Sequence, residues 1–139
     1  MRAVIDPGVL VAGLIKPDGT CGEVVYGMAE YYAAIVSPQL LDELAEVLGR
    51  RKFRRYLSLE EAEAAVRAVA GLALLVDDDP DPDRVSPDPD DDYLVALARA
   101  SGADVLVSGD SDLAELTDLG VRVLRPREFV ELLRARAAD

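Results

Sequence analysis

Short apolar runs alternate along this chain with longer segments that carry helix signals. The apolar runs lie at residues 2–6, 32–36, 73–76, 104–107 and 121–124, and each has the length of a buried strand. Helices are predicted between them at residues 7–15, 21–30, 39–48, 59–70 and 91–100, with a short one at 113–116 and a last one from residue 126. This alternation predicts an α/β fold, a three-layer α/β/α sandwich around a central, mainly parallel sheet of about five strands.

Helix-capping residues mark several of the predicted boundaries. Ser58 and Glu61 have the spacing of a capping box, and so have Thr20 and Glu23. Apolar residues recur along one stripe after Pro38 and indicate a helix. Ser37 directly precedes that helix and is predicted to cap it. The residues of the stripe are Leu40, Leu44, Val47 and Leu48.

The segment from residue 77 to residue 92, which we call the acidic segment, interrupts the alternation. It holds nine aspartates and four prolines among sixteen residues. So many prolines and like charges cannot pack together, and the segment is therefore predicted to be a loop. The chain shows no internal repeat, and its length suits one domain over residues 1–139.

The composition excludes several kinds of site. The chain has a net charge of −12 and no histidine, which excludes Ser-His-Asp, Cys-His and histidine–metal chemistry. One cysteine, Cys21, cannot form an internal disulfide, and this fits a reducing compartment. The first residues do not form a signal peptide, and the apolar runs are too short to span a bilayer. We expect a cytoplasmic protein with no membrane association.

Four acidic residues lie where predicted strands end or predicted helices begin. They are Asp6, Glu43, Asp92 and Asp110. Sites in open parallel sheets lie at the carboxyl ends of the strands, so these four side chains can converge there. Converging carboxylates repel one another unless a cation lies between them, and Mg²⁺ and Mn²⁺ prefer oxygen ligands.

Each of these acids also has a simpler structural explanation. Asp6 could cap the helix that begins at Pro7, and Asp92 could be one solvated charge in the acidic segment. Glu43 could face solvent, although its place beside the apolar stripe makes it a better candidate than its acidic neighbours. Asp110 and Asp112 could cap the helix at residues 113–116. The argument for a site depends on the four positions together.

One basic cluster follows the third predicted helix. Its members are Arg50, Arg51, Lys52, Arg54 and Arg55, with Phe53 between them. Such a cluster can contact the phosphates of RNA, and Phe53 can stack on a base or pack in the core. A solvated loop is an equally good explanation of the same residues.

Five segments, in this order and spacing, resemble motifs of PIN-domain proteins of the toxin group found in toxin–antitoxin pairs (VapC-like). Residues 4–14 resemble the opening strand with Asp-x-Asn-Val-Leu, and residues 37–44 resemble the Ser-x-x-x-x-x-Glu-Leu helix. Residues 49–55 are similar to the basic Arg-Pro-Lys-Phe stretch, and residues 88–98 resemble the Asp-Pro-x-Asp-Asp run. Residues 103–113, Ala-Asp-Val-Leu-Val-Ser-Gly-Asp-Ser-Asp-Leu, resemble the segment that carries Thr-Gly-Asp-x-Asp-Leu. The resemblance covers nearly the whole chain.

The resemblance implies that Asp6, Glu43, Asp92 and Asp110 are catalytic acids that bind Mg²⁺ or Mn²⁺, with Asp112 as a supporting acid at the metal.

Other positions follow from the same motifs. Ser108 stands where the family has a threonine and could hydrogen-bond a site carboxylate. Asp92 is chosen because it directly precedes the helix at Tyr93; Asp91 is the second choice, and Asp88 is expected to shape the turn. The departure from the family is Gly8, where the family has an asparagine.

The acidic residues predict a metal-dependent ribonuclease. The resemblance implies that it is an endoribonuclease and the toxin of a toxin–antitoxin pair, with RNA as substrate, an antitoxin as partner and a homodimer as the assembly. The alternative is a PIN-fold binding module with little or no activity, which Gly8 suggests. A receiver or haloacid-dehalogenase-like domain fits worse, because no second aspartate stands two residues after Asp6 and no lysine follows Lys52.

Overall fold

The structure is a computed structural model that describes residues 1–114 and 119–138. Its centre is a five-stranded sheet in the order β3-β2-β1-β4-β5, and every neighbouring pair is parallel. The strands are β1 (Arg2–Ile5), β2 (Ala33–Val36), β3 (Leu74–Leu75), β4 (Val105–Val107) and β5 (Arg122–Leu124). The predicted α/β/α sandwich is thereby confirmed, and all the described strands of the sheet are parallel.

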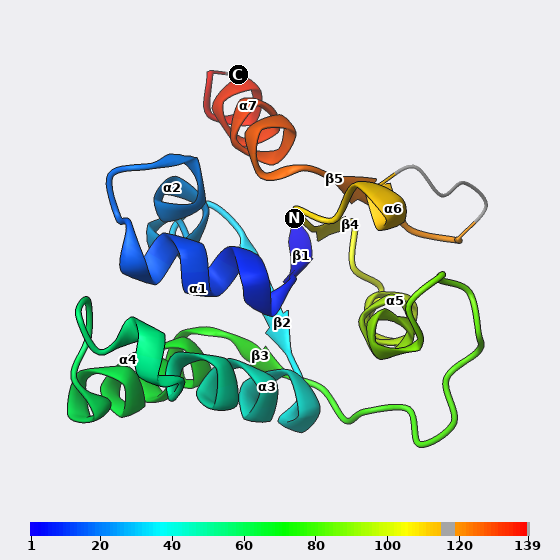
Figure 1. Cartoon of the computed structure of the whole chain (residues 1–139). Helices are drawn as coiled ribbons and strands as arrows, with labels where there is room; N and C mark the ends of the chain where they lie inside the picture. The colour runs from blue at the N-terminus through cyan, green and yellow to red at the C-terminus, as the bar shows by residue number, and fades with distance from the viewer. Residues whose placement is uncertain (115–118, 139) are drawn as a thin grey trace.

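Helices cover both faces of this sheet (Figure 1). They are α1 (Pro7–Ile15), α2 (Thr20–Tyr26), α3 (Pro38–Leu48), α4 (Leu59–Leu72), α5 (Asp92–Ser101), α6 (Ser111–Ala114) and α7 (Pro126–Ala137), with 3₁₀ turns η1 (Arg51–Phe53) and η2 (Pro89–Asp91). The chain places α1 to α4 on one side of the sheet and α5 on the other, because the strand order reverses after β3 and parallel crossovers are right-handed. Helix α7 packs against α2.

Two of the predicted caps form and one does not. The Ser37 hydroxyl accepts a hydrogen bond from the Leu40 N–H at 3.2 Å, and Ser58 and Glu61 form the predicted capping box. The capping box predicted at Thr20 is wrong, because α2 begins one residue earlier, at Thr20 itself, with Gly19 at its N-cap. Helix α2 also ends at Tyr26, well before residue 30.

The core lies on both faces of the sheet around β1 and β4. Every residue from Ala3 to Ile5 and from Val105 to Val107 is buried, as parallel strands covered on both faces should be. On α3 the predicted stripe faces this core, and its leucines are fully buried. Among the described helices, none is long and apolar enough to cross a membrane.

The strand register fixes which chain segments meet at the carboxyl edge of the sheet. Ile5 is opposite Val107, and the Asp6 N–H donates to the Val107 carbonyl at 2.9 Å. The residues just after β1 and β4 therefore lie side by side. Val4 is opposite Ile35 on the other side, so the start of α3 lies near the same point. The sheet thus brings together the segments that carry Asp6, Glu43 and Asp110.

Candidate metal centre

Asp6 is the central residue of this edge, because it joins β1 to α1. Its Oδ1 accepts a hydrogen bond from the Gly8 N–H at 2.9 Å, and its Oδ2 accepts one from the Ser108 hydroxyl at 2.9 Å. The first bond is the helix cap that the simpler explanation proposed. The second directs the other oxygen toward the end of β4. Asp6 therefore caps α1 and also faces the neighbouring strand.

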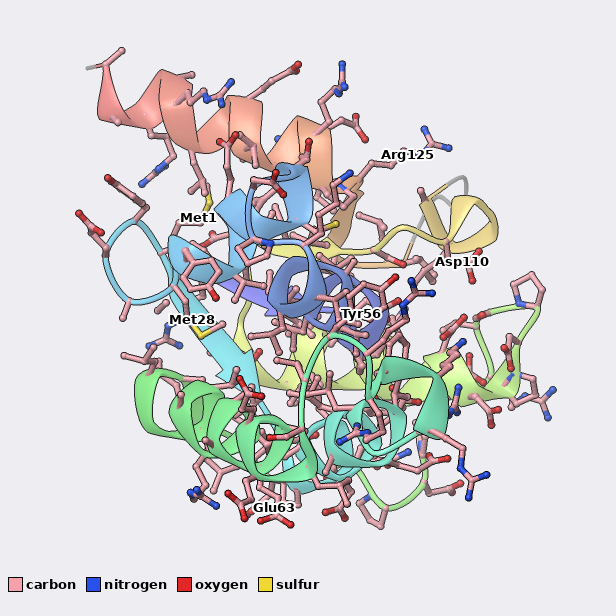
Figure 2. The ribbon with its side chains drawn as sticks, turned by 60° about the vertical axis from the view of Figure 1, so that its left-hand side comes forward. Met1, Met28, Tyr56, Glu63, Asp110 and Arg125 are labelled. Atoms are coloured by element: carbon pink, nitrogen blue, oxygen red, sulfur yellow. The ribbon has the colours of Figure 1, made fainter. Side chains whose placement is uncertain are left out.

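Ser108 connects the ends of β1 and β4. Its side chain is fully buried, and its hydroxyl both donates to Asp6 and accepts from the Asp110 N–H at 3.0 Å. These two bonds fix the carboxylate of Asp6 relative to the turn that leads into α6. Figure 2 shows Asp110 in that turn, beside α6.

Asp91 lies close to both of these aspartates. The pKa of Asp91 is raised to about 7, first by burial, then by the charge of Asp6 and by a hydrogen bond with the Asp110 carboxyl. Two carboxyl groups can share a hydrogen bond only when one of them carries a proton. Three acids from the ends of β1 and β4 and from the start of α5 therefore meet here with an excess of negative charge.

Glu43 approaches the same group from α3. Its side chain is half-buried, whereas Asp42 and Glu46 beside it are exposed. The Tyr93 hydroxyl donates a hydrogen bond to Glu43 Oε2 at 2.9 Å. Burial raises the pKa of Glu43, the bond from Tyr93 opposes this, and the charge of Asp6 raises it again. Glu43 is therefore within electrostatic reach of Asp6 and is held by a tyrosine that the sequence analysis missed.

Asp92, the acid chosen from the sequence, is directed elsewhere in the structure. Its side chain is 2 % exposed, and Oδ1 accepts hydrogen bonds from the N–H groups of Val85 at 3.1 Å and Ser86 at 2.9 Å. Its Oδ2 lies 3.3 Å from Arg84 Nε. Asp92 thus faces the acidic segment, and its neighbour Asp91 faces Asp6 and Asp110.

Asp112 belongs to α6, but its side chain lies outside the described part of the structure, so its expected role stays a prediction. Asp88 does shape the turn, as expected. Its Oδ1 accepts a hydrogen bond from the Asp90 N–H at 3.0 Å at the start of η2.

The donors suit a hard divalent cation. They are carboxylate oxygens with hydroxyls behind them, which is the oxygen-rich environment that Mg²⁺ and Mn²⁺ prefer. Within the described chain, Asp6, Glu43 and Asp91 form no ion pair with a lysine or arginine. The described side chains do not form a closed set of ligands, because no three histidine, cysteine, aspartate or glutamate side chains among them are grouped tightly enough to hold a metal. The chemistry fits a metal, and ligation requires the side chains to draw together.

The basic cluster occupies the turn between α3 and α4. Arg50, Arg51, Lys52 and Arg55 are exposed, whereas Arg54 is half-buried and donates a hydrogen bond to the Leu48 carbonyl. That bond closes the end of α3, so Arg54 serves the fold. Arg50 also lies 3.5 Å from Glu46. Three members, Arg51, Lys52 and Arg55, thus remain exposed without an ion pair among the described residues.

The distance from this cluster to the acids follows from helix geometry. Glu43 lies five residues before Leu48, the last residue of α3, which corresponds to about 7.5 Å along the helix axis, and the cluster begins two residues after that end. Figure 2 shows Tyr56, directly after the cluster, in the same region as α3 and α4, away from Asp110. A bound polynucleotide would have to extend over α3 to touch both.

Comparison with solved structures shows the same fold in proteins of low sequence identity. The VapBC2 complex of Rickettsia felis, bound to a promoter DNA fragment, contains a chain with a TM-score of 0.62 and 12% identity, and the match covers 90% of this chain and 98% of that one. A PilT N-terminus domain protein of Sulfolobus solfataricus gives a TM-score of 0.58 and 18% identity, covering 96% and 93%. A protein of Pyrobaculum aerophilum gives 0.65 and 19%, covering 97% and 90%.

Among curated proteins no sequence matches significantly. The sequence does match the PIN domain family over residues 2–112, which is most of the chain and includes β1 to β4 and all the acids described above. The fold and this match agree, and the chain belongs to the PIN domain family.

Proposed function

We propose that this protein is a Mg²⁺- or Mn²⁺-dependent endoribonuclease that acts as the toxin of a toxin–antitoxin pair. The observation that carries the proposal is the meeting of Asp6, Asp91 and Asp110 at the carboxyl edge of the sheet, where burial first and then the charge of Asp6 raise the pKa of Asp91 to about 7. A fold gains nothing from such a concentration of like charge, and perturbed carboxyl groups of this kind cluster at functional sites.

The proposed metal ligands are Asp6, Glu43, Asp91 and Asp110, with Asp112 as a further candidate. A divalent ion held there would supply an activated water and would stabilise negative charge on the attacked phosphate. Asp6 presents Oδ2 in an orientation fixed by Ser108, and Glu43 presents a carboxylate held by Tyr93. These hydroxyl contacts limit the rotation of two ligands and so favour one geometry for the cation.

The raised pKa of Asp91 has a consequence for the same mechanism. Below about pH 7 Asp91 carries a proton, and cation binding would displace it. No histidine exists in the chain to accept protons, so the carboxyl groups are the available acid–base groups near the phosphate.

The partners are proposed by analogy. One solved structure with the same fold is a VapBC2 complex, and this supports an antitoxin partner for this chain. A homodimer in the cytoplasm is proposed with it. The test of the central function is cleavage of a panel of unstructured RNAs by the purified protein with Mg²⁺, Mn²⁺ or EDTA. Cleavage that requires the metal supports the proposal, and equal cleavage in EDTA contradicts it.

A second candidate function, a binding module without strong activity, is favoured by Gly8. The residue lies in the first turn of α1, where its N–H bonds to Asp6, but it has no side chain that could reach the site. A protein of this kind would bind its partner and cleave little RNA at any metal concentration.

Replacing Gly8 with asparagine separates the two candidates. A Cβ at Gly8 would lie 3.5 Å from Asp6 Oδ1 and would meet no other neighbour within 4 Å, so the site has room for the side chain. We expect Gly8→Asn to raise kcat/KM for RNA about tenfold, because an amide beside Asp6 would orient it. Gly8→Ala is the control, since it adds only helix propensity, about 0.5–1 kcal/mol of stability. An equal gain in both variants would show that the amide does not matter.

The basic cluster makes a separate prediction about RNA affinity. We expect Arg51→Ala, Lys52→Ala and Arg55→Ala together to raise KM for RNA about fivefold and to flatten its salt dependence, with kcat unchanged, because these side chains would contact phosphates remote from the cleaved bond. The control removes the same charge from the exposed Arg67, Arg127 and Arg136. An equal effect in both triple variants would assign the change to net charge and not to the cluster.

A further inference from the structure

Asp92 is the most deeply buried carboxylate of the described chain, and its contacts differ from those of the proposed metal ligands. The exposed fraction of its side chain is 2 %. Two backbone N–H groups, from Val85 and Ser86, donate to Oδ1. Oδ2 is close enough to Arg84 for an ion pair at 3.3 Å, yet it has no hydrogen-bond donor among the described residues. Burying a carboxylate is costly, and this one is compensated only by residues 84–86.

These contacts begin a continuous series of hydrogen bonds that leads back to Asp91. The Ser86 hydroxyl accepts from the Asp88 N–H at 3.1 Å and donates to the Asp88 carbonyl at 3.0 Å. Asp88 Oδ1 accepts from the Asp90 N–H at 3.0 Å. Through these bonds, residues 84–90 form a loop that is closed by Asp92, and Asp91 lies at its end.

The acidic segment needs such closure. Residues 77–83 carry five aspartates and residues 88–92 carry four, so the segment repels itself. Apolar packing in its middle is limited to the half-buried Val85. Apart from the two bonds to Asp92, no hydrogen bond of the described structure reaches the backbone of residues 85 and 86.

We propose that Asp92 is a positioning residue: by binding residues 84–86 to the first turn of α5, it holds Asp91 against Asp6 and Asp110 and so sets the affinity of the site for a divalent cation without being a ligand. This inference rests on the proposed function, because it assigns Asp91 to the metal. It gives the two adjacent aspartates different roles, one toward the cation and one toward the backbone.

Proteolysis reports the closure of the loop independently of any metal. Arg84 is the only lysine or arginine between Arg67 and Arg99, so trypsin can cut this stretch only between residues 84 and 85. Asp92 binds the N–H groups directly after that bond. In metal-free protein we expect Asp92→Asn to be cut there about tenfold faster than wild type, because an amide is a weaker acceptor than a carboxylate. The control is Asp81→Asn, which removes an exposed charge from the same segment and should leave the rate unchanged.

Mn²⁺ titration by calorimetry, combined with RNA cleavage, tests the positioning role. We expect Asp92→Asn to weaken Mn²⁺ binding about fivefold and to keep kcat at saturating Mn²⁺ within about twofold of wild type. A large loss of kcat at saturating metal would make Asp92 a ligand and overturn the proposal. Unchanged Mn²⁺ affinity in a variant whose loop is cut faster would overturn it as well.

A second variant, Arg84→Gln, tests the same loop if Asp92→Asn does not fold. It also tests whether a change in charge alone explains the change in Mn²⁺ affinity. Removal of a positive charge should strengthen cation binding if only charge matters, whereas a loosened loop should weaken it. We expect weaker Mn²⁺ binding, about twofold, and stronger binding would overturn the proposal. Absence of Mn²⁺ binding in wild type would refute the proposed metal site and this inference, whereas Mn²⁺ binding without RNA cleavage would refute only the nuclease.

Discussion

Asp6→Asn is expected to abolish metal-dependent RNA cleavage, with a loss of about 100-fold or more in kcat, while the protein stays folded. Asparagine keeps the Oδ1 acceptor for the Gly8 N–H that caps α1, and its amide can meet the Ser108 hydroxyl in place of Oδ2. What the variant loses is a negative charge at the centre of the site and with it a ligand for the cation.

The stability of this variant distinguishes a site residue from a structural one. The charge of Asp6 raises the pKa of both Asp91 and Glu43, so it opposes ionisation of its neighbours. Removing it should leave the melting temperature of the metal-free protein unchanged or higher, as is common for residues retained for function. The matched control is Asp18→Asn, an exposed aspartate in the turn after α1. Full activity in Asp6→Asn would refute the site, and an unfolded variant would assign Asp6 to the fold.

Metal affinity should fall steeply as the pH is lowered below neutrality. The pKa of Asp91 is about 7 in the folded protein, and a cation must displace the proton that Asp91 holds below that pH. If one proton is released for each ion bound, the dissociation constant for Mn²⁺ rises about tenfold per pH unit well below pH 7, or about 50-fold between pH 7 and pH 5. Calorimetry in buffers of different ionisation enthalpy would count the released protons. Asp91→Asn should bind Mn²⁺ weakly and without this pH dependence.

The raised pKa of Asp91 also predicts how the free energy of unfolding of the metal-free protein depends on pH. The pKa of Asp91 is higher in the folded chain than the ordinary value of 3.8, so the folded state binds the proton more tightly than the unfolded state. Its contribution to stability is therefore complete below about pH 4 and is lost as the pH rises to about 7. Saturating Mn²⁺ should remove this loss. Chemical unfolding of metal-free protein at several pH values would measure it, with Asp91→Asn as the variant in which it disappears.

Local signals made most of the fold predictable. Capping residues such as Ser37 and Ser58 mark helix starts by bonds to their own backbone, which need no tertiary information. The failure at Thr20 has a tertiary cause. A Cβ at Gly13 of α1 would clash with the Cys21 carbonyl, so α1 and α2 pack closely at the start of α2, and the spacing of Thr20 and Glu23 carries no sign of this contact.

The site was predictable only as far as strand ends determine it. Asp6 and Asp110 follow adjacent parallel strands, and the register places them together whatever their neighbours are. The choice between Asp91 and Asp92 is different, because adjacent residues at a helix start point about 100° apart and both are aspartates. That choice depends on where the backbone N–H groups of the acidic segment lie. The sequence contains no sign of that position.

The basic cluster shows the same limit in another form. Five basic side chains in six residues predict one exposed basic surface. Arg54 instead donates a hydrogen bond to the Leu48 carbonyl at the end of α3. A free carbonyl at a helix end attracts the nearest long donor, and only the path of the chain after Leu48 decides which side chain that is.

The bond between Asp6 and Ser108 joins residues 102 positions apart, and this separation governs when the site can exist. Contacts so distant in sequence form late in folding, since most of the chain must be ordered before their ends meet. During synthesis, a chain that has not yet reached β4 carries Asp6 and Glu43 but neither Ser108 nor Asp110. If the proposed nuclease is correct, a nascent chain cannot cut RNA before residues 1–110 have been made. The long-range pairing of β1 with β4 then acts as a delay between translation and activity, which leaves time for a partner made alongside it to bind first.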